Sequence, residues 1–231
     1  MAALWNQSRR DDHRVGRLAD VRAERLDLAD FLESLDRRDW QARSLCPGWT
    51  VHEVLAHLTL SPRETVGPTL VRVARARGSF DRANADWARE LAAEFSPADL
   101  LAQLRATAGV DHRLALSGAL DPLTDILVHG QDIARPLGRR REMPPARVTP
   151  ALEHVWSSVF YGRPDKRFNG LRFIATDAGW SAGDGSSEVR GPIGDLLLVA
   201  SGRAAGLANL TGPGVEDAAA RMQRRRRAAA A

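Results

Sequence analysis

The sequence is poor in cysteine, in aromatic residues and in long apolar runs. One cysteine, Cys46, stands among 231 residues, so no disulfide forms within the chain, and a reducing compartment is expected. No apolar stretch approaches the roughly 18 residues that a membrane-spanning helix needs, and the longest runs, such as Leu196–Ala200, have the length of core segments. The first residues lack the positive segment and apolar stretch of a secretory signal, which predicts a cytoplasmic protein with no membrane partner.

The excess of positive charge is confined to the C-terminus. The chain has 33 basic and 29 acidic residues, and Arg224–Arg227 supply four of the basic ones, so the remainder is neutral. A neutral body without a basic stripe or stacking aromatic residues makes nucleic-acid binding the least favoured function. We expect residues 223–231 to form a disordered, solvated basic tail.

The hydrophobic pattern predicts an all-helical domain over residues 11–138. Apolar side chains recur every three or four residues, as at Leu28, Phe31 and Leu35, which is typical of amphipathic helices. Gly138 is a typical residue at which the last of these helices ends. The composition, 44% hydrophobic and 27% charged, is that of a globular chain with a sizeable core.

Several short motifs predict where individual helices begin. Thr50–Glu53 has the pattern of a capping box, in which the Thr hydroxyl and the Glu carboxylate accept hydrogen bonds from free amides. Ser96–Pro97, Asp121–Pro122 and Thr149–Pro150 each place a capping residue before a proline, which costs nothing at the first helical position.

A smaller α+β domain is predicted over residues 146–222, after a linker rich in Arg and Pro. Alternation of apolar and polar residues favours strands, and helical spacing favours helices. The predicted strands are Leu171–Thr176 and Ser187–Arg190, with a further candidate starting at Gly179–Trp180, and the predicted helices are Pro192–Ser201 and Val215–Met222.

Two helical segments carry side chains suited to a metal ion. Asp125 and His129 are four residues apart, so they project from one face of a helix, and His57 lies beside the apolar stripe of another helix. Catalytic zinc usually has three protein ligands and an open fourth position, and such sites are often built between facing helices. The spacing alone also fits a surface ion pair and a core histidine, so it leaves the metal site open.

Other polar residues have simpler interpretations. His52 is expected to be an exposed first-turn residue, and His112 and His154 are expected to be structural. Cys46 is read as a small buried residue and not a nucleophile, because no helix-borne base is placed beside it by the sequence. Asp132 either supports a histidine by a hydrogen bond or is solvated.

Three blocks of the chain together resemble a known family. They are the Cys46–Leu58 block, with its Pro-Gly-Trp turn and Ala-His-Leu ending, the Asp125–Gly138 block and the Val189–Arg203 block. In this order they resemble the mycothiol-dependent maleylpyruvate isomerase family, whose members have a DinB-like metal-binding bundle and often a small sterol-carrier-like domain. The resemblance implies an N-terminal DinB-like four-helix bundle followed by a small α+β sterol-carrier-like domain.

The resemblance also implies roles for individual residues. His57, Asp125 and His129 would bind a divalent ion, usually zinc, although the best-known family pattern has glutamate at the position of Asp125. Aspartate is one methylene shorter but is still an acceptable zinc ligand. Arg203, at the end of the third block, is a candidate for binding a carboxylate of the substrate or of the thiol. Its alternative role is to end a helix, where positive charge is favourable.

The function implied by this resemblance is thiol chemistry with mycothiol, the low-molecular-weight thiol of actinobacteria. A zinc ion favours the thiolate form of a bound thiol, and the thiolate adds to an electrophilic small molecule. Reversible addition to a double bond gives cis–trans isomerisation, and stable addition gives S-transfer. We therefore expect a metalloenzyme that is an isomerase or a mycothiol S-transferase, as a monomer or homodimer. The alternative is a non-catalytic metal-binding or small-molecule-binding protein that retains the fold.

Overall fold

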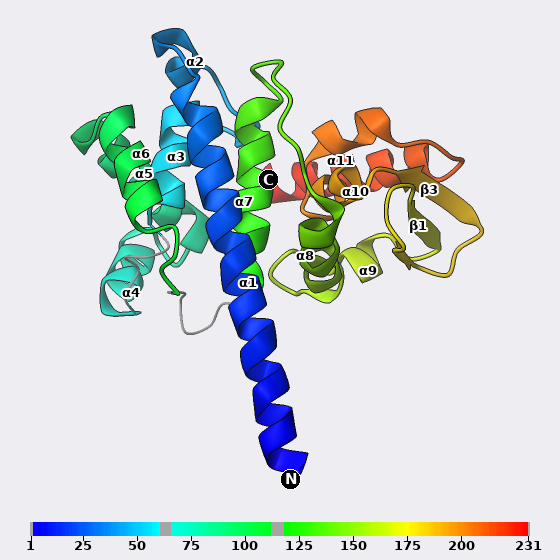
Figure 1. Cartoon of the computed structure of the whole chain (residues 1–231). Helices are drawn as coiled ribbons and strands as arrows, with labels where there is room; N and C mark the ends of the chain where they lie inside the picture. Colours follow the sequence, from blue (N-terminus) through cyan, green and yellow to red (C-terminus); the bar gives the residue numbers. More distant parts are fainter. Residues whose placement is uncertain (1, 61–65, 112–117, 231) are drawn as a thin grey trace. The chain divides into compact units, whose positions relative to one another are not determined.

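The computed structural model describes residues 2–60, 66–111 and 118–230 (Figure 1). His112 lies outside these ranges. The chain divides into two compact units, Met1–Arg141 and Glu142–Ala231. In the described ranges, no helix combines the length and the apolar character needed to cross a bilayer.

The first unit is helical. Its helices, in chain order, are α1 (Ala2–Glu33), α2 (Arg37–Gln41), α3 (Val51–Leu58), α4 (Val66–Arg75), α5 (Phe80–Glu94), α6 (Pro97–Ala106) and α7 (Asp121–Ala134).

Four of these helices enclose the core of the first unit. Helices α1 and α3 each pack against both α6 and α7, which makes α1, α3, α6 and α7 a four-helix bundle (Figure 1). Each contributes fully buried leucines, among them Leu28, Leu55, Leu104 and Leu127. Helix α5 packs on α3, and α4 packs on α5. The predicted helical N-terminal domain is thus confirmed.

Two of the predicted helix starts have the expected chemistry. Thr50 Oγ1 accepts the Glu53 amide at 3.3 Å, while Glu53 Oε2 accepts the Thr50 amide at 2.6 Å. Ser96 and Asp99 form the same reciprocal pair at the start of α6. Both capping boxes satisfy amides that have no partner inside the helix.

The prediction for Asp121 was wrong in detail. Asp121 is the first residue of α7, and Leu120 precedes it without any side-chain cap. The Asp121 carboxylate instead accepts the amide of Gly118, at 2.5 Å, in the preceding turn. Pro122 remains in the first helical turn, where it needs no amide partner.

The second unit combines helices with a small sheet. Its elements are α8 (Pro145–Ser157), α9 (Pro164–Arg167), β1 (Leu171–Ala175), β2 (Ser181–Ala182), β3 (Ser187–Gly191), α10 (Ile193–Ala200), the 3₁₀ helix η1 (Ala204–Asn209) and α11 (Val215–Ala230).

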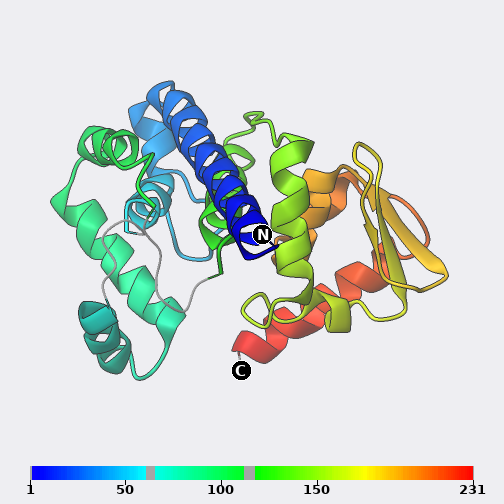
Figure 2. The same ribbon diagram turned by 60° about the horizontal axis from the view of Figure 1, so that its bottom comes forward.

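The sheet has the strand order β2-β1-β3 (Figure 2). Strand β1 pairs antiparallel with β2, where Phe173 faces Ala182, and parallel with β3, where Phe173 faces Val189. Helix α10 packs against α8, η1 and β1, and all eight of its residues are buried. The α+β architecture predicted for this part of the chain is confirmed.

Two boundaries in the second unit differ from the prediction. Helix α8 begins at Pro145, and Pro150 lies inside it, because Pro145 already provides a favourable first position. The Thr149 hydroxyl, expected as a cap, donates to the Pro145 carbonyl at 2.8 Å. At the other end, α11 continues to Ala230 where a disordered tail was expected, since Arg and Ala are among the strongest helix formers.

Candidate metal centre

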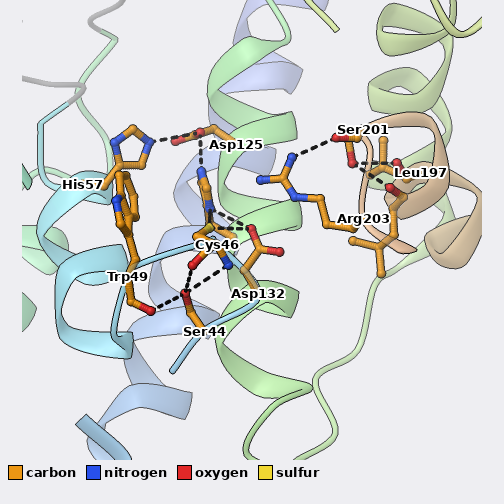
Figure 3. Close-up of polar contacts among 11 residues, drawn as sticks. Ser44, Cys46, Trp49, His57, Asp125, Asp132, Leu197, Ser201 and Arg203 are labelled. Carbon is orange, nitrogen blue, oxygen red and sulfur yellow. Dashed lines mark hydrogen bonds and ion pairs between the residues drawn. The ribbon is translucent and has the colours of Figure 1, made fainter. Parts of the chain in front are cut away.

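Helices α3 and α7 bring His57, Asp125 and His129 together. His57 Nε2 lies 3.5 Å from Asp125 Oδ1, and His129 Nε2 lies 3.3 Å from the same oxygen. Figure 3 shows His57 facing Asp125 across the two helices. One donor atom from each of the three residues lies within 4.8 Å of the other two, so one ion could contact all three.

Local sequence explains how each helix presents its part of this group. The capping box at Thr50 begins α3, the helix that carries His57. The buried side chains of Val54, Leu55 and Leu58 determine which side of this helix faces the core. Helix α7 is buried along most of its length. Because Asp125 and His129 are one turn apart, their side chains point the same way.

The three side chains are electrostatically complementary. Burial by itself would raise the pKa of the Asp125 carboxyl, but His129 and His57 beside it hold that pKa well below its usual range. Burial would lower the pKa of His129, but the carboxylate of Asp125 and the hydrogen bond to Asp132 raise it well above the ordinary value. A bound cation would therefore compete with protons on His129.

The donor set fits zinc. Two imidazole nitrogens and one carboxylate oxygen are its usual ligands, and three protein ligands leave a position open for a thiol or water. Tetrahedral zinc with bonds of 2.0–2.1 Å separates neighbouring ligand atoms by about 3.4 Å. The two distances to Asp125 Oδ1, 3.3 and 3.5 Å, match this spacing.

A second group of polar atoms lies on the other side of the His129 ring. Asp132 Oδ2 lies 2.9 Å from His129 Nδ1, and the Asp132 side chain has no exposed surface. The Cys46 thiol donates to the same Asp132 oxygen at 3.2 Å and lies 3.5 Å from His129 Nδ1. Asp132 is therefore the support of a histidine and is not solvated.

Cys46 and Trp49 are site residues that the sequence reasoning missed. Cys46 is half-buried and contacts both His129 and Asp132, although the sequence placed no base near it. The Trp49 ring lies 5.3 Å from the His57 ring and 6.4 Å, nearly parallel, from that of His129. The sequence signal for both residues was their position in the turn just before α3, the helix that carries His57.

The remaining predicted residues lie outside this group. His52 is half-buried and not exposed as expected, and its Nε2–H donates to the Phe95 carbonyl at 3.1 Å. Burial lowers the pKa of His52. In the second unit, His154 makes an edge-to-face contact with Tyr161.

Arg203 lies in the second unit, just after α10. Its Nη1 donates to the Ser201 carbonyl at 3.0 Å (Figure 3). Its amide donates to the Leu198 carbonyl at 2.7 Å. Both contacts satisfy carbonyl groups around the end of α10.

The fold and the site define a class: a helical bundle with a candidate metal centre between two of its helices, followed by a small α+β domain. Residues 21–122 match the family model described as the mycothiol maleylpyruvate isomerase N-terminal domain. The match includes His57 and ends just before Asp125. Over these residues the chain is therefore similar to the N-terminal domain of the mycothiol maleylpyruvate isomerase family.

Solved structures support the same fold. A crystal structure of the mycothiol-dependent maleylpyruvate isomerase aligns with a TM-score of 0.51 and 18% sequence identity, covering 86% of this chain and 92% of that one. A crystal structure of a point mutant of that isomerase aligns with the same values. The comparison with curated proteins finds no match. At this identity, the structural likeness shows the fold alone.

Proposed function

We propose that this protein is a divalent-metal-dependent enzyme, with zinc as the ion, that activates mycothiol for addition to an electrophilic small molecule. The observation that carries the proposal is the convergence of His57 Nε2, Asp125 Oδ1 and His129 Nε2 at zinc-like spacing. The choice of mycothiol as the thiol is supported by the match of residues 21–122 to a family domain that is named for mycothiol.

The residues of the first unit have separate tasks in this proposal. His57, Asp125 and His129 would hold the ion, and the Asp132 carboxylate lies 2.9 Å from His129 Nδ1. A bound zinc ion stabilises the thiolate form of a coordinated thiol. Trp49 covers both histidine rings on one side, which limits the access of water to them.

Arg203 is proposed as the residue that binds a carboxylate of the substrate or of mycothiol. A guanidinium presents paired donors that match the two oxygens of a carboxylate. The reaction outcome, maleylpyruvate-like cis–trans isomerisation or S-transfer, then depends on whether the thiol adduct is released by elimination or kept.

The first test is the metal content of the purified protein, by elemental analysis. We expect about one equivalent of zinc per chain, as for a single three-ligand site. The metal should be lost in His57→Ala and in His129→Ala. His52→Ala is the matched control, because His52 lies on the same helix but outside the group, and it should keep the metal.

The second test adds mycothiol to the zinc-loaded protein with maleylpyruvate or another small electrophile. Isomerisation or a mycothiol adduct, absent in His57→Ala, would support the enzyme. A protein that stays metal-free after incubation with zinc would contradict the proposal. A protein that binds zinc but consumes no mycothiol would be the non-catalytic alternative.

A further inference from the structure

Asp132 is a buried carboxylate that serves two segments of the first unit at once. Its Oδ2 accepts from His129 Nδ1 at 2.9 Å and from the Cys46 thiol at 3.2 Å, while its backbone carbonyl accepts the Leu45 amide at 3.0 Å. A buried carboxylate is costly unless hydrogen bonds satisfy it. These contacts both satisfy it and tie the turn before α3 to α7.

The contact with His129 selects one form of that imidazole. A neutral histidine donates from one ring nitrogen and accepts at the other. When the ring is neutral and its proton is the one that Asp132 accepts from Nδ1, the lone pair is on Nε2. Nε2 is the nitrogen that lies 3.3 Å from Asp125 Oδ1 and belongs to the metal group.

His57 provides an internal contrast. Its Nδ1 is buried and has no hydrogen-bond partner among the residues that the structure describes. The ring of His57 is held by packing against Trp49 and His129, at 5.3 and 4.9 Å between ring centroids. Of the two histidines, His129 therefore has a carboxylate at its Nδ1, and His57 does not.

We infer that Asp132 is a positioning residue, which favours the Nδ1–H tautomer of the neutral His129 ring and thereby makes Nε2 the nitrogen that binds the ion. This inference rests on the proposed function, because it assigns His129 Nε2 to the metal. Carboxylates that orient metal-bound histidines commonly raise metal affinity by about 10- to 100-fold.

The decisive comparison is between Asp132 and its neighbour Gln131. Gln131 is also buried on α7, but its side chain forms hydrogen bonds with the Arg135 side chain and with the Arg141 carbonyl instead of with His129. Gln131→Ala therefore removes a buried polar side chain without touching the site. Asp132→Asn keeps the shape of the side chain while removing its charge, and Asp132→Ala removes the acceptor.

Zinc affinity, measured by competition with a chromophoric chelator, is the first readout. We expect a loss of about 10- to 100-fold, greater in Asp132→Ala than in Asp132→Asn, and no change in Gln131→Ala. The Cys46→Ala variant, which keeps Asp132 and His129 paired, should lose less affinity than Asp132→Ala. Wild-type affinity in both Asp132 variants would overturn the inference while leaving the proposed function standing.

The tautomer of His129 is the second readout, and it needs no metal. Long-range proton–nitrogen NMR on the metal-free protein, at a pH where the ring is neutral, should show Nδ1–H in the wild type. In Asp132→Ala it should shift toward Nε2–H, the form that free histidine prefers. Nε2–H in the wild type would overturn the inference whether or not zinc binds.

Cobalt substitution tests the competing arrangement, in which Cys46, His129 and Asp132 themselves hold the ion. Cobalt bound through His57, Asp125 and His129 should give d–d bands without a thiolate charge-transfer band. A charge-transfer band that disappears in Cys46→Ser would make Asp132 a ligand and would contradict its positioning role.

Discussion

Helices α7 and α10 are both buried helices of their own units, but they are buried with different side chains. All eight residues of α10 are buried, and Asp195 is its one polar side chain. Helix α7 buries eleven residues, and four of them are polar: Thr124, His129, Gln131 and Asp132. Buried apolar area stabilises a fold by about 25 cal/mol per Å², whereas a buried polar group costs free energy unless it is bonded.

The difference between the two helices indicates which of them carries residues of the candidate site. Helix α10 is a core element of ordinary composition. Helix α7 carries two candidate metal ligands and the carboxylate that orients one of them, so its polar burial serves a site. Because proteins are only marginally stable, burying several polar side chains on one helix is a considerable cost in folding free energy. Proteins retain such side chains where function requires them.

The largest expected effect on stability comes from α10. Leu197 is fully buried, and Leu197→Ala should lower the free energy of unfolding by about 2–5 kcal/mol, through lost burial and the cavity left behind. Chemical denaturation measures this loss. Val159→Ala, at a position that is 77% exposed in the same unit, should change stability by less than about 0.5 kcal/mol. Equal losses of stability in Leu197→Ala and Val159→Ala would contradict the stabilising role assigned to the buried side chains of α10.

An intermediate effect is expected from the polar core of α7. Gln131 Nε2 donates to the Arg141 carbonyl at 2.9 Å, and its Oε1 accepts from Arg135 at 3.0 Å. Gln131→Ala should cost about 1–3 kcal/mol, because it leaves part-buried groups without these partners. Unfolding curves of the metal-free protein give this value. A cost of zero would mean that α7 tolerates unpaired polar groups.

The smallest effect is expected at the start of α3. Thr50→Ala removes the hydroxyl that accepts the Glu53 amide, and the loss should be about 1 kcal/mol of unfolding free energy. Thr50→Ser is the matched control, since it keeps an acceptor at the same place and should restore most of the loss. A Thr50→Ser variant as unstable as Thr50→Ala would show that the methyl group, and not the cap, matters here.

Much of the local structure was predictable. The capping box at Thr50, the N-cap at Ser96 and the strands at Leu171 and Ser187 are set by residues close in sequence, and the structure confirms them. The predictions of secondary structure that were wrong concern helix ends. Asp121 bonds backward to Gly118, and α11 extends to Ala230, because competing hydrogen bonds and helix propensity decide such boundaries residue by residue.

The candidate site was predictable only in part. The four-residue spacing of Asp125 and His129 already places them on one face of a helix, and family resemblance adds His57. The roles of Cys46 and Trp49 were not predictable, because their contacts with His129 join residues about eighty positions apart in the chain. Such contacts depend on how whole helices pack and not on local propensity.

The sequence by itself determined the division into a helical and an α+β part, which two ligand candidates share α7, and the similarity of residues 21–122 to a known family domain. Only the tertiary structure decided that α3 packs on α7 with His57 Nε2 3.5 Å from Asp125, and that Asp132 is buried against His129. The physical reason is range: caps and spacing act over three or four residues, whereas the site forms when the core of the bundle closes around side chains from separate helices.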